Sequence, residues 1–158
     1  MGDGKFLEKK ILNTFTELAG TLGYSPVHGR IIGVLLIKGR PVSLQELAKS
    51  TGYSSSMVSL SLDLLEILGV IRKVKKSADR KLYVELTGDL LSCLKNALLV
   101  KVKKGIDNSL SDFEESSKLI EKAGPEERKR LRKVIETLES EIKRLDRYVT
   151  MLSGIKLP

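Results

Sequence analysis

The chain has 158 residues, of which 41% are hydrophobic and 30% are charged, and its formal net charge is +8 at pH 7. This balance excludes a disordered chain, and the length suffices for one domain with a buried core plus a long helical extension. The apolar run at residues 31–37 is far shorter than the roughly 20 residues that a membrane span needs, so no membrane partner is expected.

The N-terminus and the scarcity of cysteine and histidine limit the possible cellular location, metal sites and enzyme classes. Residues 1–10 lack the apolar core and cleavage site of a signal peptide, which predicts a cytoplasmic protein. The single cysteine, Cys93, can form neither an intrachain disulfide nor a multi-cysteine zinc site. His28 is the only histidine, and we interpret it as a surface residue and not as a metal ligand. The sequence shows no nucleophile paired with a base and no phosphate-binding loop, so neither an enzyme nor a cofactor is expected.

The first half of the chain contains four predicted helices. Apolar residues at helical spacing predict a helix over residues 5–22, and Ser25 followed by Pro26 starts a second that runs to about residue 38. Ser43 and Glu46 form a capping box that opens a third, short helix ending near Gly52. A fourth helix follows Ser54 and stops at residue 69.

Residues 70–84 alternate apolar and basic side chains around a short link, which predicts a β-hairpin. They hold six basic residues and one acidic residue: Arg72, Lys73, Lys75, Lys76, Arg80 and Lys81, with Asp79. A solvated face usually mixes signs, so this concentration indicates a polyanionic partner, with nucleic acid favoured over anionic lipid. A tight pair of helices followed by such a hairpin predicts a winged helix-turn-helix.

The fourth helix would be the one that reads DNA, yet residues 51–71 contain no Lys or Arg. On a helical wheel, Val58, Leu62 and Leu65 face the other helices, with Ser61 and Leu68 beside them. Candidate DNA contacts lie at the helix start and on the outer side: Ser54, Ser55, Ser56, Ser59 and Leu60. Backbone N–H groups at the helix start favour a phosphate, and serine hydroxyls or a leucine against a thymine methyl discriminate bases only weakly. The basic hairpin would therefore supply most of the phosphate attraction, and Arg80 near its tip is the best candidate for entering a minor groove.

The second half predicts how two copies meet. Two long helices, residues 89–122 and the segment after the turn at 123–127, form a predicted helical hairpin. A heptad pattern runs through residues 131–152: Leu131, Ile135, Leu138, Ile142, Leu145, Val149 and Leu152. β-Branched residues at a with leucine at d favour a parallel two-stranded coiled coil. Val134 and Tyr148 widen the stripe, so packing in a bundle against the preceding helix is the alternative.

Residues 29–86 resemble the winged-helix domain of MarR-like regulators, and most closely their GbsR-type and archaeal branch. The similar features are a Gly-Arg helix start, a serine-rich turn, a V-S-x-x-L step, a G-V-I strand and a D-R-K-x-Y wing. The resemblance implies a homodimeric transcriptional regulator that binds an inverted-repeat operator in double-stranded DNA. It carries DNA-contact roles onto Ser54, Ser55, Ser59 and Arg80, whereas Asp63 and Leu64 stand where such helices often carry a basic residue.

The expected architecture is mainly α with a small β-hairpin wing: a winged helix-turn-helix domain at residues 1–88 and a helical dimerisation region at 89–158. Two other functions stay open, a non-specific architectural nucleic-acid-binding protein and a winged helix that binds another protein. The sequence names no small-molecule effector, and scattered aromatic residues give no ground for expecting a quaternary amine.

Overall fold

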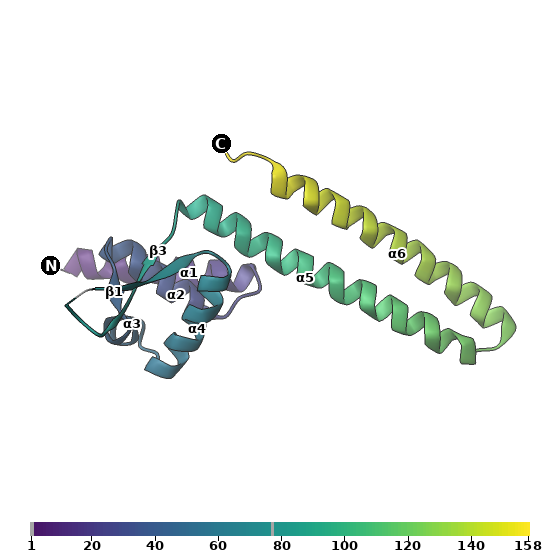
Figure 1. The fold of residues 1–158 in the computed structure, drawn as a ribbon, viewed down its shortest axis with the longest axis horizontal. Coiled ribbons are helices and arrows are strands. Elements are labelled where there is room, and N and C mark those ends of the chain that lie inside the picture. The colour runs from purple at the N-terminus through teal and green to yellow at the C-terminus, as the bar shows by residue number, and fades with distance from the viewer. Residues whose placement is uncertain (1, 77) are drawn as a thin grey trace. The chain divides into compact units, whose positions relative to one another are not determined.

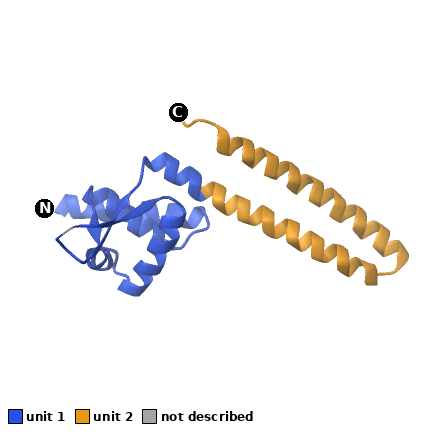
Figure 2. Ribbon diagram, in the orientation of Figure 1, with its two compact units in different colours: residues 1–97 blue, residues 98–158 orange. Residues whose placement is uncertain are grey.

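The computed structural model describes residues 2–76 and 78–158. The chain divides into two compact units, residues 1–97 and residues 98–158 (Figure 2). None of the helices in the described ranges is long and apolar enough to cross a membrane.

The first unit is a small helical domain with a three-stranded sheet. Its elements in chain order are α1 (Gly2–Thr21), α2 (Pro26–Lys38), β1 (Val42–Ser43), α3 (Leu44–Thr51), α4 (Ser55–Ile67), β2 (Ile71–Lys75), β3 (Leu82–Leu86) and the beginning of α5 (Leu90–Leu119) (Figure 1). The four helices predicted in this half are confirmed. This is the winged helix-turn-helix that the sequence predicted.

Local signals explain where the helices begin and end. Ser43 caps α3, because its hydroxyl accepts a hydrogen bond from the backbone N–H of Glu46 at 3.2 Å. Helices α2 and α3 end at Gly39 and Gly52, whose φ angles of 62° and 78° lie in the left-handed region that favours glycine. Residues that punctuate the sequence therefore fixed these boundaries.

The sheet contains one strand that the sequence analysis did not predict. The strand order is β1-β3-β2, and both pairings are antiparallel. Val84 of β3 lies at the centre, opposite Val42 on one side and Lys73 on the other. Strand β1 has two residues, which is too short for an alternating pattern to reveal it.

The core of this unit lies between α2, α3, α4 and the sheet. Ile31, Leu47, Val58 and Val84 are completely buried there. Helix α1 packs closely against α2, where a Cβ atom at Gly29 would overlap the backbone of α1. The residues of α4 that the wheel placed inward, including Leu62 and Leu65, are buried as predicted.

Helix α5 begins at Leu90, close to the expected domain boundary after residue 88, but its first turns belong to the first unit. Cys93 and Ala97 are buried at 4% and 8% exposure, and Cys93 joins the winged-helix core. The Tyr24 hydroxyl donates a 2.6 Å hydrogen bond to the carbonyl of Ala97. Burial raises the pKa of the Cys93 thiol, which therefore stays protonated at neutral pH.

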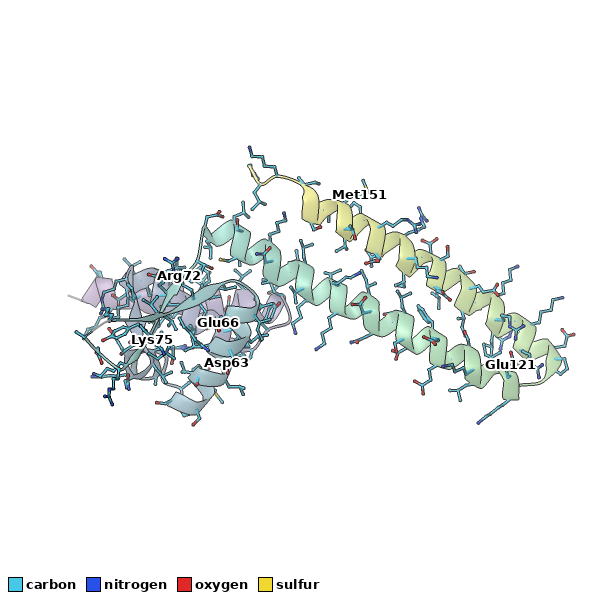
Figure 3. All side chains as sticks on the ribbon, viewed as in Figure 1. Asp63, Glu66, Arg72, Lys75, Glu121 and Met151 are labelled. Atoms are coloured by element: carbon cyan, nitrogen blue, oxygen red, sulfur yellow. The ribbon has the colours of Figure 1, made fainter. Side chains whose placement is uncertain are left out.

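The second unit is an antiparallel helical hairpin. The remainder of α5 is followed by a short 3-10 helix, η1 (Ile120–Lys122), and by α6 (Pro125–Gly154) (Figure 1). Ile106 of α5 and Val149 of α6 are buried at 2% and 7% exposure. The Lys103 ammonium lies 2.5 Å from the Asp146 carboxylate and links the two helices. Near the turn, Arg132 forms an ion pair with Glu121, which Figure 3 labels near the end of α5.

The predicted heptad stripe of α6 is divided between two environments. Leu131, Ile135, Ile142 and Leu152 are half-buried and Val149 is buried. Leu138 and Leu145 instead stay 45% and 39% exposed, and they continue into an exposed apolar surface with Val134, Tyr148 and Met151. We call these five residues the outer stripe of α6: Val134, Leu138, Leu145, Tyr148 and Met151. One chain by itself leaves this surface uncovered.

Candidate nucleic-acid interface

The beginning of α4 presents a cluster of serines. Ser54 is the N-cap, and its hydroxyl accepts a hydrogen bond from the backbone N–H of Met57 at 3.2 Å. Ser55 and Ser56 occupy the exposed first turn. Backbone N–H groups in the first turn of a helix have no hydrogen-bond acceptor within the helix. Together with the helix dipole, the N–H groups of Ser55 and Ser56 favour an anion such as a phosphate.

The outer face of α4 combines hydroxyl and apolar groups. Leu60 is 74% exposed, whereas Ser59 is only half-buried at the side of the helix. The Ser61 hydroxyl donates to the Met57 carbonyl at 2.9 Å and so belongs to the buried side. Of the predicted DNA-contact residues on α4, Ser55, Ser56 and Leu60 are therefore exposed, and Ser59 is half-buried.

Two of the six basic residues of the hairpin are engaged within the domain. The Arg72 guanidinium lies 2.5 Å from the Glu85 carboxylate across the β2–β3 pair. The Lys73 ammonium lies 2.7 Å from Asp63 and 3.6 Å from Glu66. Figure 3 labels these two acidic residues on α4. The hydrogen bond to Asp63 raises the pKa of Lys73. These pairs neutralise two positive charges that the sequence analysis had assigned to phosphates.

The Lys73 ion pairs also link the wing to α4. Asp63 and Glu66 stand one turn apart on α4, and Lys73 reaches both from β2. The sequence analysis said of Asp63 that it stands where such helices often carry a basic residue, and it gave Asp63 no partner. Its partner is ten positions away on another element, so no local pattern could have revealed the contact.

The other four basic residues, Lys75, Lys76, Arg80 and Lys81, are exposed. None of them forms an ion pair with a carboxylate in the described ranges 2–76 and 78–158. They make the wing the part of this domain with the most free positive charge. The link between the two wing strands is longer than predicted, because β2 ends at Lys75 and β3 begins at Leu82.

Asp79 and Tyr83 organise the wing tip, and sequence reasoning gave neither of them a role. The Asp79 carboxylate accepts hydrogen bonds from the Lys81 backbone N–H at 3.0 Å and from the Tyr83 hydroxyl at 2.9 Å. The bond from Lys81 is the main reason that the pKa of Asp79 is lowered. The Lys76 ammonium lies 4.3 Å from the centre of the Tyr83 ring, in cation–π contact.

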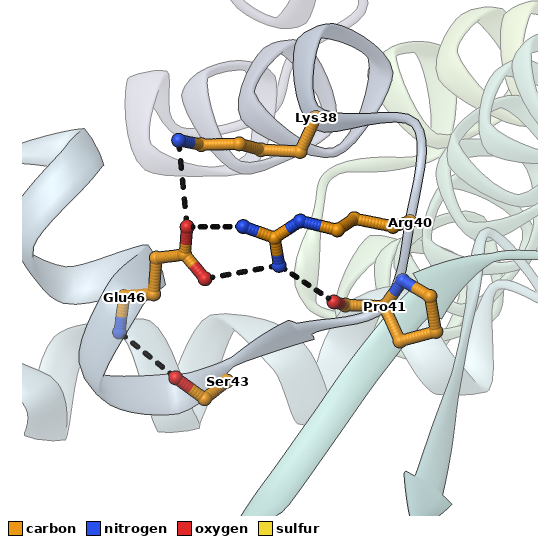
Figure 4. Close-up of polar contacts among 5 residues, drawn as sticks. All are labelled: Lys38, Arg40, Pro41, Ser43 and Glu46. Carbon is orange, nitrogen blue, oxygen red and sulfur yellow. Dashed lines mark hydrogen bonds and ion pairs between the residues drawn. The ribbon is translucent and has the colours of Figure 1, made fainter.

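A further basic cluster lies at the start of the helix-turn-helix, around Gly39. Arg40 donates two hydrogen bonds to the Glu46 carboxylate, at 2.8 and 3.2 Å, and one to the Pro41 carbonyl at 3.1 Å (Figure 4). Lys38 lies 3.4 Å from the same carboxylate. The bond from Arg40 lowers the pKa of Glu46. Two cations share one anion, so the cluster retains positive charge.

The sequence analysis gave Lys38 and Arg40 no role, because two basic residues beside a glycine turn form no pattern that distinguishes a binding site from an exposed turn. In helix-turn-helix proteins the first helix of the pair crosses the DNA backbone. Glu46 belongs to that helix here, α3, so the cluster accompanies the element that passes the phosphates in such proteins.

The first unit also contains a small apolar cavity of about 30 Å³. Its walls come from α1, α2, α4 and the start of α5, and they include Phe15, Leu65 and Cys93. A volume of this size holds little more than a water molecule. Among the described residues, no group of three or more His, Cys, Asp or Glu side chains is placed to hold a metal ion.

No protein-family model matches the sequence, and the search of curated proteins found no match. Solved structures do match. A protein described as a transcriptional regulator has a TM-score of 0.63 and 17% identity, over 94% of this chain and 99% of its own. BldR from Sulfolobus solfataricus, a transcriptional regulator, has a TM-score of 0.44 and 19% identity, over 90% of this chain and 91% of its own. A mutant of S. aureus MepR bound to an oligodeoxyribonucleotide has a TM-score of 0.45 and 16% identity, over 87% of this chain and 94% of its own.

The first of these likenesses shows the fold alone, because its sequence identity is low, and the other two are too distant to support any further argument. The fold is a winged helix-turn-helix followed by long C-terminal helices, as the sequence analysis predicted.

Proposed function

We propose that this chain is a homodimeric, DNA-binding transcriptional regulator that recognises a palindromic operator. The single observation that carries the proposal is the placement of the wing charges: Lys75, Lys76, Arg80 and Lys81 are exposed and without carboxylate partners in the described residues. Membership of the MarR-like family, in its GbsR-type branch, and a cytoplasmic location are parts of the same proposal.

The contacts divide between two elements of the winged domain. The wing supplies sequence-independent attraction to phosphates, and Arg80 near its tip is suited to a narrow minor groove. The N–H groups of Ser55 and Ser56 hold a phosphate at the start of α4. Helix α4 fills the major groove, and because its outer face lacks Arg, Asn and Gln, discrimination between bases is modest per half-site.

A dimer would raise both affinity and discrimination by holding two half-sites at a fixed spacing of about one helical turn. The outer stripe of α6 supports this part of the proposal, because its five large apolar residues are 39% to 71% exposed in one chain. Contiguous apolar surface of this kind marks interaction sites in soluble proteins. A second copy of the chain is the partner that we infer for it.

Genomic footprinting of the intact protein tests the proposal against its two alternatives. A regulator gives discrete peaks over inverted repeats. Even coverage of the genome would instead indicate an architectural protein, and the absence of enrichment would indicate a winged helix that binds another protein. A gel-shift titration on a recovered peak sequence and on a scrambled duplex of the same composition then measures the discrimination directly.

A further inference from the structure

The surface of α4 that points away from the core has an unusual composition. Val58, Leu62 and Leu65 fix the buried side. The opposite ridge consists of residues three or four positions apart, Ser56, Leu60, Asp63 and Ile67. Leu60 is 74% exposed and Ile67 is 82% exposed. Large apolar side chains thus occupy half of the ridge that a recognition helix would present to DNA.

Leu60 lies on a part of the helix where the side chains are apolar or carry hydroxyl groups. Residues 54–62 contain no charged side chain. The first charged residue of the helix, Asp63, has its carboxylate 2.7 Å from the ammonium of Lys73. Beside Leu60 on the helix surface lie Met57, which is 48% exposed, and Ser56. The side chains of the first two turns therefore offer a base pair hydroxyl groups and apolar groups without charge.

In the major groove, the C5-methyl group of thymine is the apolar group among the base edges. Recognition helices of this type contact base edges mainly with their N-terminal residues. Leu60 lies in that half of α4, near the serines that favour a phosphate, and the exposed cations of the wing complement the charge of a duplex. From this combination we infer that Leu60, flanked by Met57, reads thymine methyl groups, so that the preferred DNA is rich in A·T pairs with accessible thymine methyls.

This inference rests on the proposed DNA binding, and defined duplexes test it without knowledge of the operator. The intact protein is titrated with alternating poly(dA-dT) and with alternating poly(dA-dU), which lacks the methyl groups but keeps the phosphates and hydrogen-bonding edges. We expect affinity for the uracil duplex to fall about fourfold for each methyl group that the side chains cover. Poly(dG-dC) and its 5-methylcytosine counterpart provide the reverse comparison, and methylation should tighten binding.

Two variants assign the effect to the residue. Leu60→Ala should bind the thymine and uracil duplexes with nearly equal affinity. Ile67→Ala removes a similarly exposed side chain about 10 Å farther along the helix axis; Ile67 is the last residue of α4, outside the N-terminal half that contacts base edges, so this variant should keep the wild-type ratio. Both side chains are exposed, so both variants should retain the wild-type melting temperature.

Each other outcome has a definite meaning. Equal binding of the two duplexes by the wild-type protein overturns methyl reading and leaves DNA binding intact. A thymine preference that persists in Leu60→Ala assigns the preference to DNA shape and also overturns the inference. Binding to neither duplex at low salt overturns the proposed function itself, and the exposed ridge would then be a surface for a protein partner.

Discussion

At the scale of single residues, Tyr83 holds the wing tip through two different contacts. Its hydroxyl donates to Asp79, and its ring faces the ammonium of Lys76. Tyr83→Phe keeps the ring and removes the hydroxyl. We expect DNA affinity to fall by up to about tenfold, because one hydrogen bond to a charged group no longer organises the tip. The dependence on salt should stay unchanged, because the variant keeps every cation.

A gel-shift titration over a range of salt concentrations measures both quantities for Tyr83→Phe. Ser117→Ala, which removes an exposed hydroxyl from the helical hairpin outside the outer stripe, is the control and should bind as the wild type does. Wild-type affinity for Tyr83→Phe would show that the wing tip needs no such support.

Glu46 predicts a small pH dependence of stability. Arg40 lowers the pKa of this carboxyl below its ordinary value of 4.5. A lowered pKa means that the ionised form is stabilised by folding, so the contribution is complete above about pH 4.5 and disappears as the pH falls through the folded pKa. Glu46→Gln should therefore destabilise the protein slightly at pH 7, and its stability should fall less than that of the wild type between pH 5 and pH 3.

Urea midpoints at several pH values measure this difference. Glu8→Gln, an exposed position on α1, provides the control and should follow the wild-type profile. Parallel profiles for Glu46→Gln and the wild type would contradict the coupling between Glu46 and Arg40.

At the scale of elements, the proposed DNA binding assigns the electrostatic attraction to the wing. Replacing the four exposed cations, Lys75, Lys76, Arg80 and Lys81, by Ala should weaken binding to every duplex. The slope of log affinity against log salt should become shallower by about 0.9 for each phosphate that the variant no longer neutralises. Exchanging Lys for Arg and Arg for Lys at the same four positions keeps the charge and should keep the slope. A folded Ala variant with the wild-type slope would remove the wing from the interface.

The ion pair between Asp63 of α4 and Lys73 of β2 leads to a prediction of tighter DNA binding. Asp63 lies on the outer ridge of α4 and neutralises Lys73. Asp63→Asn removes a negative charge from the face of α4 that we propose to contact DNA, and it leaves Lys73 freer to bind a phosphate. We expect tighter binding to any duplex and a salt slope steeper by about 0.9, the value for one additional phosphate. Asp107→Asn, an exposed acidic position in the helical hairpin, serves as the control for net charge. Weaker binding would mean that the ion pair positions the wing.

At the scale of the whole molecule, the outer stripe of α6 is the proposed dimer surface. Leu138 and Leu145 are 45% and 39% exposed within one chain, so we expect charged replacements there to leave the chain folded. Leu138→Glu combined with Leu145→Glu should dissociate a dimer that buries them, because each interface would bury unpaired charges. Affinity for a palindrome should then fall toward that of a half-site.

Sedimentation at several concentrations, together with a gel-shift titration, measures both effects. Ser140→Glu combined with Thr150→Glu adds the same charge to exposed positions of α6 outside the stripe and should remain dimeric. A Leu138 and Leu145 double variant that is still dimeric, with full affinity, would show that the subunits meet elsewhere.

The sequence by itself determined the four helices of the winged domain, the two strands of its wing and the inward face of α4. Its signals are local: Ser43 caps a helix with its own hydroxyl, Gly39 and Gly52 end helices with positive φ angles, and the spacing of Val58, Leu62 and Leu65 fixes one buried side. Each such signal acts over a few residues, so it is readable without knowledge of the fold.

The tertiary structure alone decided which charges are free and which apolar residues are covered. Lys73 meets Asp63, and Arg40 meets Glu46, only because separate elements pack together. The heptad pattern of α6 shows one apolar stripe, but packing within the hairpin buries Val149 and leaves Leu138 exposed. Helical periodicity records that a side chain is apolar, and the physical reason for its burial is the neighbour that a distant part of the chain, or a second chain, brings against it.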